Sequence, residues 1–178
     1  MTVYVLRHEH RDPLDPRFYS PLTPDGRRGA DELVTALVPL RIDAVYTSPF
    51  LRAVQTAHPF CATHGHRMRV DHALYESLDC PLFGSNDSHR TWRDLPSVYH
   101  SAIDTEYASI HGAVSLRETF DQVRDRVRPF VHALRERHNE DNVLLVTHLT
   151  TANAVRREWG EDCVADADIA MGEWVELT

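Results

Sequence analysis

Lysine is missing from this chain of 178 residues, and all 19 of its basic residues are arginine. Without a lysine amine, Schiff-base chemistry on a side chain is excluded. Any contact with a phosphate group must come from guanidinium groups, imidazole rings or backbone amides. Of these, the planar guanidinium is especially well shaped to bind an oxyanion through two parallel hydrogen bonds.

Cysteine is scarce, and long apolar runs are missing as well. The three cysteines, Cys61, Cys80 and Cys163, form neither a disulfide framework nor a zinc pattern, so we expect a reducing, cytoplasmic setting. No apolar run approaches the roughly 20 residues that span a bilayer. The N-terminus also lacks a basic segment followed by an apolar stretch and a cleavage site. The sequence therefore predicts neither a membrane-spanning helix nor a signal peptide.

The net charge of −8 argues against a nucleic-acid partner, because such proteins normally present a basic face. It is compatible with a small anionic substrate, since a pocket needs only local positive charge. Hydrophobic residues make up 42% and charged residues 26%, as in ordinary globular proteins. The length suits one domain over residues 1–178, and the sequence gives no signal for a particular oligomeric state.

Short apolar runs alternate with helical periodicity along the chain. Runs typical of strands cover residues 3–6, 44–47, 67–70, 142–147 and 172–177. Helices are predicted to begin at Pro24, after Pro49, at Leu116 behind a capping box at 115–118, and near Thr150. This alternation predicts an α/β three-layer sandwich, with a mainly parallel central sheet and helices on both faces. Residues 71–114 have no sustained period, so we interpret them as a small helical insertion that forms a lid.

Three of the predicted strands run into turns that carry a cation or an imidazole. The first strand ends in Arg7 and His8, and the strand at 142–147 ends at His148. Between them in sequence, the second strand leads to Arg52, about one turn into the next helix. The carboxyl ends of parallel strands share one sheet edge, so these side chains are expected to converge there. Helix N-termini at the same edge would add backbone amides, and the pattern predicts a phosphate-binding site.

Four segments resemble, in order, the motifs of the histidine phosphatase superfamily, which has the phosphoglycerate mutase-like fold. They are VYVLRHEH, PLTPDGRRGA, VYTSPFLRAVQTA and VLLVTHLTTANAV, and they span nearly the whole chain. SPFLRAVQTA matches the family pattern S-P-x-x-R-A-x-Q-T-A at every fixed position. The resemblance implies a metal-independent phosphomonoester hydrolase that works through a phosphohistidine intermediate on a small phosphorylated substrate. By the same resemblance His8 is the nucleophile, and Arg7, Arg52 and His148 bind the phosphoryl oxygens.

The resemblance also implies two further site residues. In the first branch of the family, a glutamate after the third strand protonates the leaving alkoxide, and Glu76 in the segment LYESL is in that place. Glu76 is thus the candidate general acid, which would activate water in the second step. RHEHRDP fits the acid-phosphatase pattern R-H-G-x-R-x-P except at Glu9, which makes Arg11 a candidate phosphate ligand. Leu149 after His148 excludes the His-Asp pair of that branch, so the first branch is the better assignment.

Two positions depart from the family pattern. Glu9 replaces the usual glycine after the nucleophile, and its carboxylate would repel a phosphate unless the side chain turns away. Leu149 replaces a glycine that often follows the second histidine. A catalytically weak or inactive phosphate-binding protein of the same fold is therefore one alternative. A phosphoglycerate mutase-type phosphotransferase is another, disfavoured because the chain is short for a mutase and its insertion has few extra cations.

Two further patterns suggest other chemistry. Cys61 and Arg67 have the C-x₅-R spacing of cysteine-dependent phosphatases. That mechanism needs a strand before the cysteine and a helix after it, whereas here we expect a helix before and a strand after. The H-x-H pairs at 8–10 and 64–66 resemble zinc ligands, but no carboxylate set completes such a site. Hydrolase barrels that use such a pair need about 250 residues. We therefore expect no metal and no other cofactor.

Overall fold

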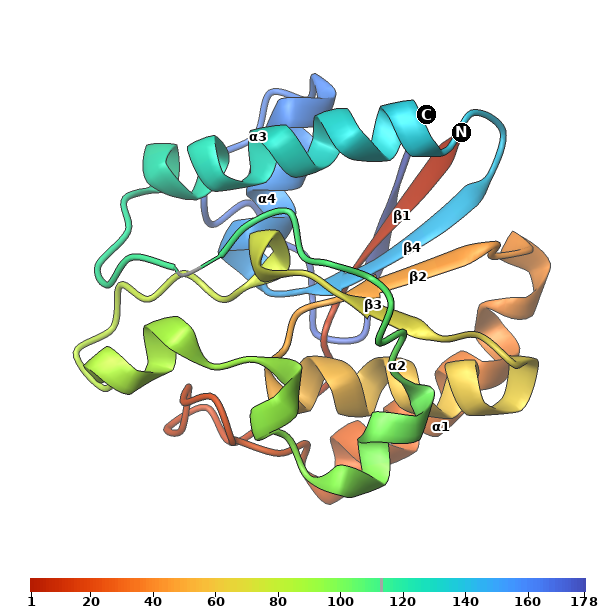
Figure 1. The fold of residues 1–178 in the computed structure, drawn as a ribbon, viewed down its shortest axis with the longest axis horizontal. Helices are drawn as coiled ribbons and strands as arrows, with labels where there is room; N and C mark the ends of the chain where they lie inside the picture. Colours follow the sequence, from red (N-terminus) through yellow and green to blue (C-terminus); the bar gives the residue numbers. More distant parts are fainter. Residues whose placement is uncertain (113) are drawn as a thin grey trace.

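The computed structural model describes residues 1–112 and 114–178, so residue 113 of the predicted insertion lies outside the described residues. Its centre is a five-stranded sheet in the order β3-β2-β4-β1-β5 (Figure 1). Four strands run parallel: β1 (Thr2–Arg7), β2 (Ala44–Thr47), β3 (Met68–Val70) and β4 (Asn142–Thr147). The last strand, β5 (Trp174–Leu177), pairs antiparallel with β1 at the sheet edge.

Two pairs of helices cover the two faces of the sheet. Helices α1 (Pro24–Ala36) and α2 (Leu51–His64) lie on one face (Figure 1). Helices α3 (Phe120–Arg137) and α4 (Leu149–Trp159) lie on the other. The predicted three-layer α/β architecture with a mainly parallel sheet is confirmed.

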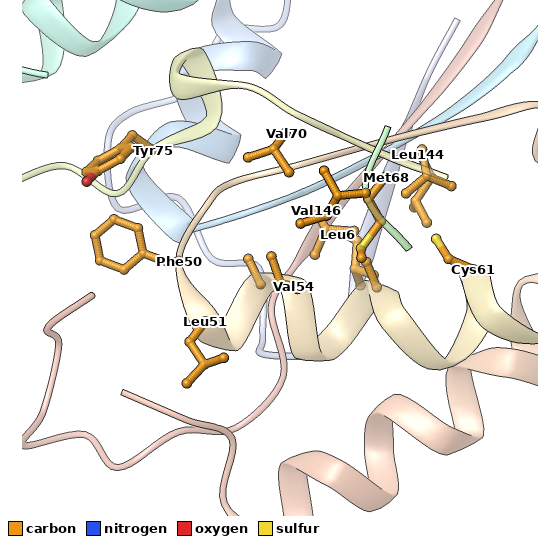
Figure 2. Packing of buried hydrophobic residues seen from close by; sticks show 14 of the residues in the cluster. Leu6, Phe50, Leu51, Val54, Cys61, Met68, Val70, Tyr75, Leu144 and Val146 are labelled. Carbon is orange, nitrogen blue, oxygen red and sulfur yellow. The ribbon is translucent and has the colours of Figure 1, made fainter. Parts of the chain in front are cut away.

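The core follows from the twofold periodicity of the strands, whose successive side chains point to opposite faces. In β1, Leu6 packs in the cluster beneath α1 and α2, together with Val54 of α2 (Figure 2). The neighbouring Val5 packs in the cluster under α3 and α4, together with Phe130 of α3. All four side chains are buried. Because β1 lies between β4 and β5 and is covered on both faces, its carboxyl end is held rigidly, and that end carries Arg7 and His8.

Helix α3 begins at Phe120, so the prediction that it starts at Leu116 is wrong. Thr119 is its N-cap, with the Gln122 amide donating to Thr119 Oγ1 at 3.3 Å and the Thr119 amide donating to Gln122 Oε1 at 2.8 Å. Glu118 does not serve in a cap because its buried carboxylate pairs with Arg126 Nη2 at 2.8 Å. A tertiary ion pair has therefore overridden the local capping signal.

The insertion contains short 3₁₀ turns in its described residues. They are η2 (His72–Leu74), η3 (Ser85–His89), η4 (Trp92–Asp94) and η5 (Ser97–Ala102). Another 3₁₀ turn, η1 (Val38–Leu40), links α1 to the segment before β2. After η5, Ile103 forms a bridge with Met68 of β3 and so ties the insertion to the sheet. Among the described residues, no helix has both the length and the apolar character needed to cross a membrane.

Candidate active site

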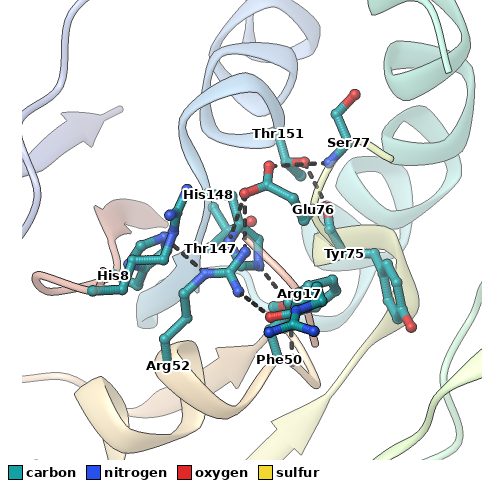
Figure 3. Close-up of polar contacts among 12 residues, drawn as sticks. His8, Arg17, Phe50, Arg52, Tyr75, Glu76, Ser77, Thr147, His148 and Thr151 are labelled. Atoms are coloured by element: carbon teal, nitrogen blue, oxygen red, sulfur yellow. Dashed lines mark hydrogen bonds and ion pairs between the residues drawn. The ribbon is translucent and has the colours of Figure 1, made fainter. Parts of the chain in front are cut away.

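The carboxyl ends of β1, β2 and β4 bring His8, Arg52 and His148 together at one sheet edge (Figure 3). The two imidazole rings have centroids 5.0 Å apart, and Arg52 Nε donates to His8 Nε2 at 3.1 Å. All three side chains are buried. The predicted convergence of distant residues is therefore present, and the topology of the parallel sheet is its cause.

The partners of His8 assign its tautomer. Nδ1 lies 2.7 Å from the backbone oxygen of Glu9, which can only accept, so Nδ1 carries the proton. Nε2 faces the N–H of Arg52 and so presents a lone pair. Burial, together with the nearby Arg52 and His148, lowers the pKa of His8 well below its ordinary value. His8 is thus a neutral imidazole with a basic Nε2, the form that a nucleophile requires.

The guanidinium of Arg52 reaches three different partners. Besides His8, Nη1 donates to the Arg17 carbonyl at 3.0 Å and Nη2 donates to Glu76 Oε2 at 3.1 Å. Its central carbon lies 4.5 Å from the ring centroid of Phe50. Burial lowers the pKa of Arg52 to about 10, although Glu76 opposes this shift, and the group stays cationic at neutral pH. A fixed cation therefore lies directly beside the imidazole of His8.

Glu76 lies between Arg52 and His148. Its Oε2 is 3.3 Å from His148 Nδ1, and its Oε1 accepts from the Ser77 amide at 3.1 Å. Burial alone would raise the pKa of Glu76, but His148 and Arg52 more than offset this and lower it below its usual range. Burial lowers the pKa of His148 to about 4, although Glu76 opposes the shift. The free site therefore holds an ionised carboxylate next to a neutral imidazole.

Two buried nitrogen atoms around this site, Arg7 Nε and Arg11 Nε, have no hydrogen-bond partner within the described part of the chain. Arg7 is held by a 2.7 Å bond from Nη1 to the Ile169 carbonyl, and Arg11 by one of 2.7 Å to the Asp12 carbonyl. Arg7 and Arg11 line a cavity of about 410 Å³ together with His8 and Glu76. Unsatisfied buried donors beside a cavity are suited to an oxyanion, which supplies the missing acceptors.

The side chain of Glu9 turns away from this cavity. It is not among the residues that line it, and its Oε2 accepts from the His10 amide at 3.1 Å and lies 3.0 Å from His10 Nδ1. The carboxylate occupies space that two glycines leave open, since a Cβ at Gly29 or Gly172 would lie 2.4 or 2.1 Å from its Oε1. Direct contact between this carboxylate and a phosphate in the cavity is therefore avoided.

Two residues that the sequence did not single out hold the backbone just before Glu76. Arg126 Nη1 donates to three carbonyl oxygens of residues 72–75 at 2.7–3.2 Å. Thr151 Oγ1 donates to the Tyr75 carbonyl at 2.6 Å. The available signal was the charge of Arg126 on the apolar face of α3, next to Val127, because a buried arginine needs acceptors.

His148 and His8 also have supporting partners. His148 Nε2 lies 2.9 Å from Ser48 Oγ, and the amide of Glu9 donates to Thr56 Oγ1 at 3.0 Å. Ser48 and Thr56 belong to the SPFLRAVQTA segment, so the motif supplies Arg52, contacts His148 directly and supports His8 through the backbone of Glu9. The sequence showed the motif, but the contacts of these hydroxyl groups depend on the fold.

A metal ion is the main competitor for this site. Ligand atoms of His8, Glu76 and His148 lie within 4.8 Å of one another, close enough to share an ion. However, Arg52 already binds His8 Nε2 and Glu76 Oε2, and its positive charge would repel a metal ion. The donor set therefore fits the guanidinium better than a metal.

The C-x₅-R pattern has no matching geometry. Cys61 lies inside α2 and β3 follows it, which is the element order expected from the sequence and the reverse of the one needed. Burial raises the pKa of Cys61 to about 12, so its thiol is not ionised at neutral pH. Cys61 therefore lacks the thiolate of a cysteine-dependent phosphatase.

Comparison with known proteins agrees with this geometry. The model of the histidine phosphatase superfamily (branch 1) matches residues 4–169. A candidate phosphoserine phosphatase 2 of Hydrogenobacter thermophilus is 26% identical over 160 residues, covering 86% of this chain and 75% of that protein. A mycobacterial glucosyl-3-phosphoglycerate phosphatase complexed with VO3 shares the fold at a TM-score of 0.72 and 23% identity, covering 99% of this chain and 92% of that one. YhfR of Bacillus stearothermophilus has a TM-score of 0.69 at 23% identity, covering 98% and 89%.

Proposed function

This chain belongs to branch 1 of the histidine phosphatase superfamily, and we propose that it hydrolyses small phosphomonoesters through a phosphohistidine formed on His8. One observation carries the proposal: His8 is neutral with a lone pair on Nε2, and it lines the same cavity as Arg7 and Arg11, whose buried Nε atoms lack acceptors. The free thiols of the three cysteines fit a reducing, cytoplasmic setting for this activity.

In the first step, His8 Nε2 attacks phosphorus in line, so that an N–P bond forms and the P–O bond to the alcohol breaks. Arg7 and Arg11 donate to the phosphoryl oxygens through their unpartnered Nε atoms, and His148 turns its Nδ1 hydrogen bond from Glu76 to another of these oxygens. Arg52 transfers its hydrogen bond from His8 Nε2 to an oxygen and frees the lone pair. These fixed donors stabilise the charge spread over the equatorial oxygens without a metal.

The leaving alkoxide needs a proton, and Glu76 is the proposed donor. Glu76 is ionised in the free site because Arg52 and His148 lower its pKa. A bound phosphoryl group engages both of these partners and adds negative charge beside the carboxylate, so the pKa of Glu76 rises on binding. Glu76 takes up the proton that the phosphomonoester brings as its monoanion and passes it to the leaving oxygen as the P–O bond breaks. In the second step Glu76 takes a proton from the attacking water, the N–P bond breaks, and His8 and phosphate are released.

The nucleophile is tested by comparing His8→Ala with the unchanged protein on p-nitrophenyl phosphate in EDTA. We expect His8→Ala to lose at least roughly 10³-fold in kcat, because no other group replaces the imidazole. The control is His132→Ala on the exposed face of α3, which should keep full activity. Mass spectrometry of the quenched protein should find the phosphoryl group on His8. Retained activity in His8→Ala, or loss of activity in EDTA, would overturn the mechanism.

The proton donor is tested with Glu76→Gln and two kinds of leaving group. An alkoxide leaves poorly without a proton, whereas p-nitrophenolate needs little help, so alkyl phosphates should slow roughly 10²- to 10⁴-fold more than p-nitrophenyl phosphate. Steady-state kinetics with ethyl and p-nitrophenyl phosphate measures the difference. Equal slowing of both would indicate a positioning role, and no slowing would assign the proton to another group.

Phosphate binding without turnover is the second candidate, favoured by Leu149 because this side chain lines the cavity. In that case phosphate or vanadate would raise the melting temperature while no phosphomonoester in a panel is hydrolysed. A mutase has less support, because the arginines that line the cavity, Arg7 and Arg11, are both assigned to the transferred phosphoryl group.

A further inference from the structure

We propose that the substrate is the phosphomonoester of an apolar, uncharged alcohol, an inference that rests on the proposed function of this site. The cavity of about 410 Å³ lies in the size range of pockets that enclose whole small molecules. It therefore has room for an alcohol as well as for the phosphoryl group.

Three separate parts of the chain give this cavity an apolar wall. The loop after β1 contributes Leu14, the insertion contributes Leu82 and Phe83, and the first turn of α4 contributes Leu149. Leu14 is 83% exposed and Leu82 is 56% exposed, although large apolar side chains are usually covered. An apolar alcohol in the cavity would remove this surface from water, which is favourable in proportion to the area covered.

The charges around the cavity disfavour a second anionic group on the substrate. Two arginines line the cavity near His8: Arg7 at the end of β1 and Arg11 in the loop that follows. In the proposed function, the negative charge of the phosphoryl group balances their positive charge. The other charged residues that line the cavity are the carboxylates of Glu76 and Asp79, with Asp79 exposed on the insertion side. A carboxylate on the substrate would meet Asp79 with no cation left to balance it. Phosphoserine and phosphoglycerates are therefore disfavoured, and uncharged alcohols are favoured.

The test is a series of n-alkyl phosphates from ethyl to octyl, with phosphoserine as the charged comparison. Since each buried methylene contributes about 0.8 kcal/mol, kcat/KM should rise roughly two- to fourfold per methylene until the cavity is filled. Phosphoserine should be at least roughly tenfold poorer than butyl phosphate. A flat series, or phosphoserine as the better substrate, would overturn the inference.

Leu82→Asp tests whether this wall produces the chain-length effect. The variant should lower the rise in kcat/KM per methylene toward zero. Val164→Asp is the matched control, since Val164 is 65% exposed but does not line the cavity, and it should keep the slope. If kcat/KM rises equally per methylene in both variants, the apolar wall does not cause the chain-length effect. Turnover that depends on His8 but not on chain length would overturn this inference alone, whereas no turnover of any ester would overturn the proposed function with it.

Discussion

Glu9 shows how one residue can act through its backbone and its side chain in different directions. Its carbonyl accepts from His8 Nδ1 and so fixes the tautomer of the proposed nucleophile, while its amide is tied to Thr56. Its carboxylate points the other way, into the space beside Gly29 and Gly172. An acidic residue next to the nucleophile is thus compatible with phosphate binding because two distant positions have no side chain.

This arrangement predicts that Gly29→Ala destabilises the protein when position 9 is glutamate and stabilises it when position 9 is glycine. Alanine is favoured over glycine by about 1 kcal/mol inside a helix such as α1. With Glu9 present, the new Cβ would lie 2.4 Å from Oε1, so the substitution should destabilise the protein by about 1–3 kcal/mol. In a Glu9→Gly background the clash is gone, and the same substitution should stabilise by up to about 1 kcal/mol. Urea denaturation of the four proteins measures the cycle.

Gly26→Ala is the matched control for this cycle. Gly26 lies in the same helix, but a Cβ there would come within 2.2 Å of the His10 carbonyl oxygen, which is backbone. It should therefore destabilise both backgrounds by a similar amount. The explanation fails if Gly29→Ala has the same sign with and without the Glu9 side chain.

At the scale of elements, the strands of the sheet position His8 and His148, while α3 holds the segment that carries Glu76. Arg126 of α3 binds the backbone of residues 72–75 and pairs with Glu118 through two bonds of 3.0 and 2.8 Å. Such a buried pair is strongly destabilising to break, because the remaining charge has no partner. Helix α3, on the opposite face of the sheet from α2, is therefore connected to the site through the backbone before Glu76.

Arg126→Met should lower the free energy of unfolding by about 3–5 kcal/mol, because Glu118 and the three carbonyl oxygens lose their partner. In the protein that remains folded, Glu76 should shift, and ethyl phosphate should slow more than p-nitrophenyl phosphate. Arg124→Met, which removes a partly exposed arginine of the same helix, is the control and should leave the ratio of the two rates unchanged. An unchanged ratio in folded Arg126→Met would show a purely structural role.

The sequence predicted the features that depend on periodicity and chain order. Strand ends carrying His8, Arg52 and His148 could be placed together because parallel strands share an edge. The orientation of Glu9 could not be predicted, since it depends on glycines at 29 and 172. The start of α3 was misplaced for a similar reason: Glu118 looks like a capping residue until its partner Arg126 is known. Local patterns are informative until a tertiary contact uses the same side chain.

At the scale of the whole molecule, burial lowers the pKa of histidines in several places. His8 and His148 are in the site, and His58, His66 and His72 lie elsewhere; desolvation is the leading cause for each. Each of these groups binds a proton more readily in the unfolded chain than in the folded protein. Acid therefore favours unfolding through many sites at once, and the active site contributes to this sensitivity.

We expect the free energy of unfolding to fall as pH drops from 7 to 5. The folded pKa values lie below the unfolded value of about 6.5, so the stability is fully present above that pH and is lost progressively below it. Each extra proton taken up on unfolding steepens the dependence of the free energy of unfolding on pH by about 1.4 kcal/mol per pH unit. His148→Asn should reduce the slope, since the pKa of His148 falls to about 4, and the exposed His132→Asn is the control. Urea denaturation at pH 7, 6 and 5 measures it, and stability that is constant or rises toward pH 5 would contradict neutral burial of these imidazoles.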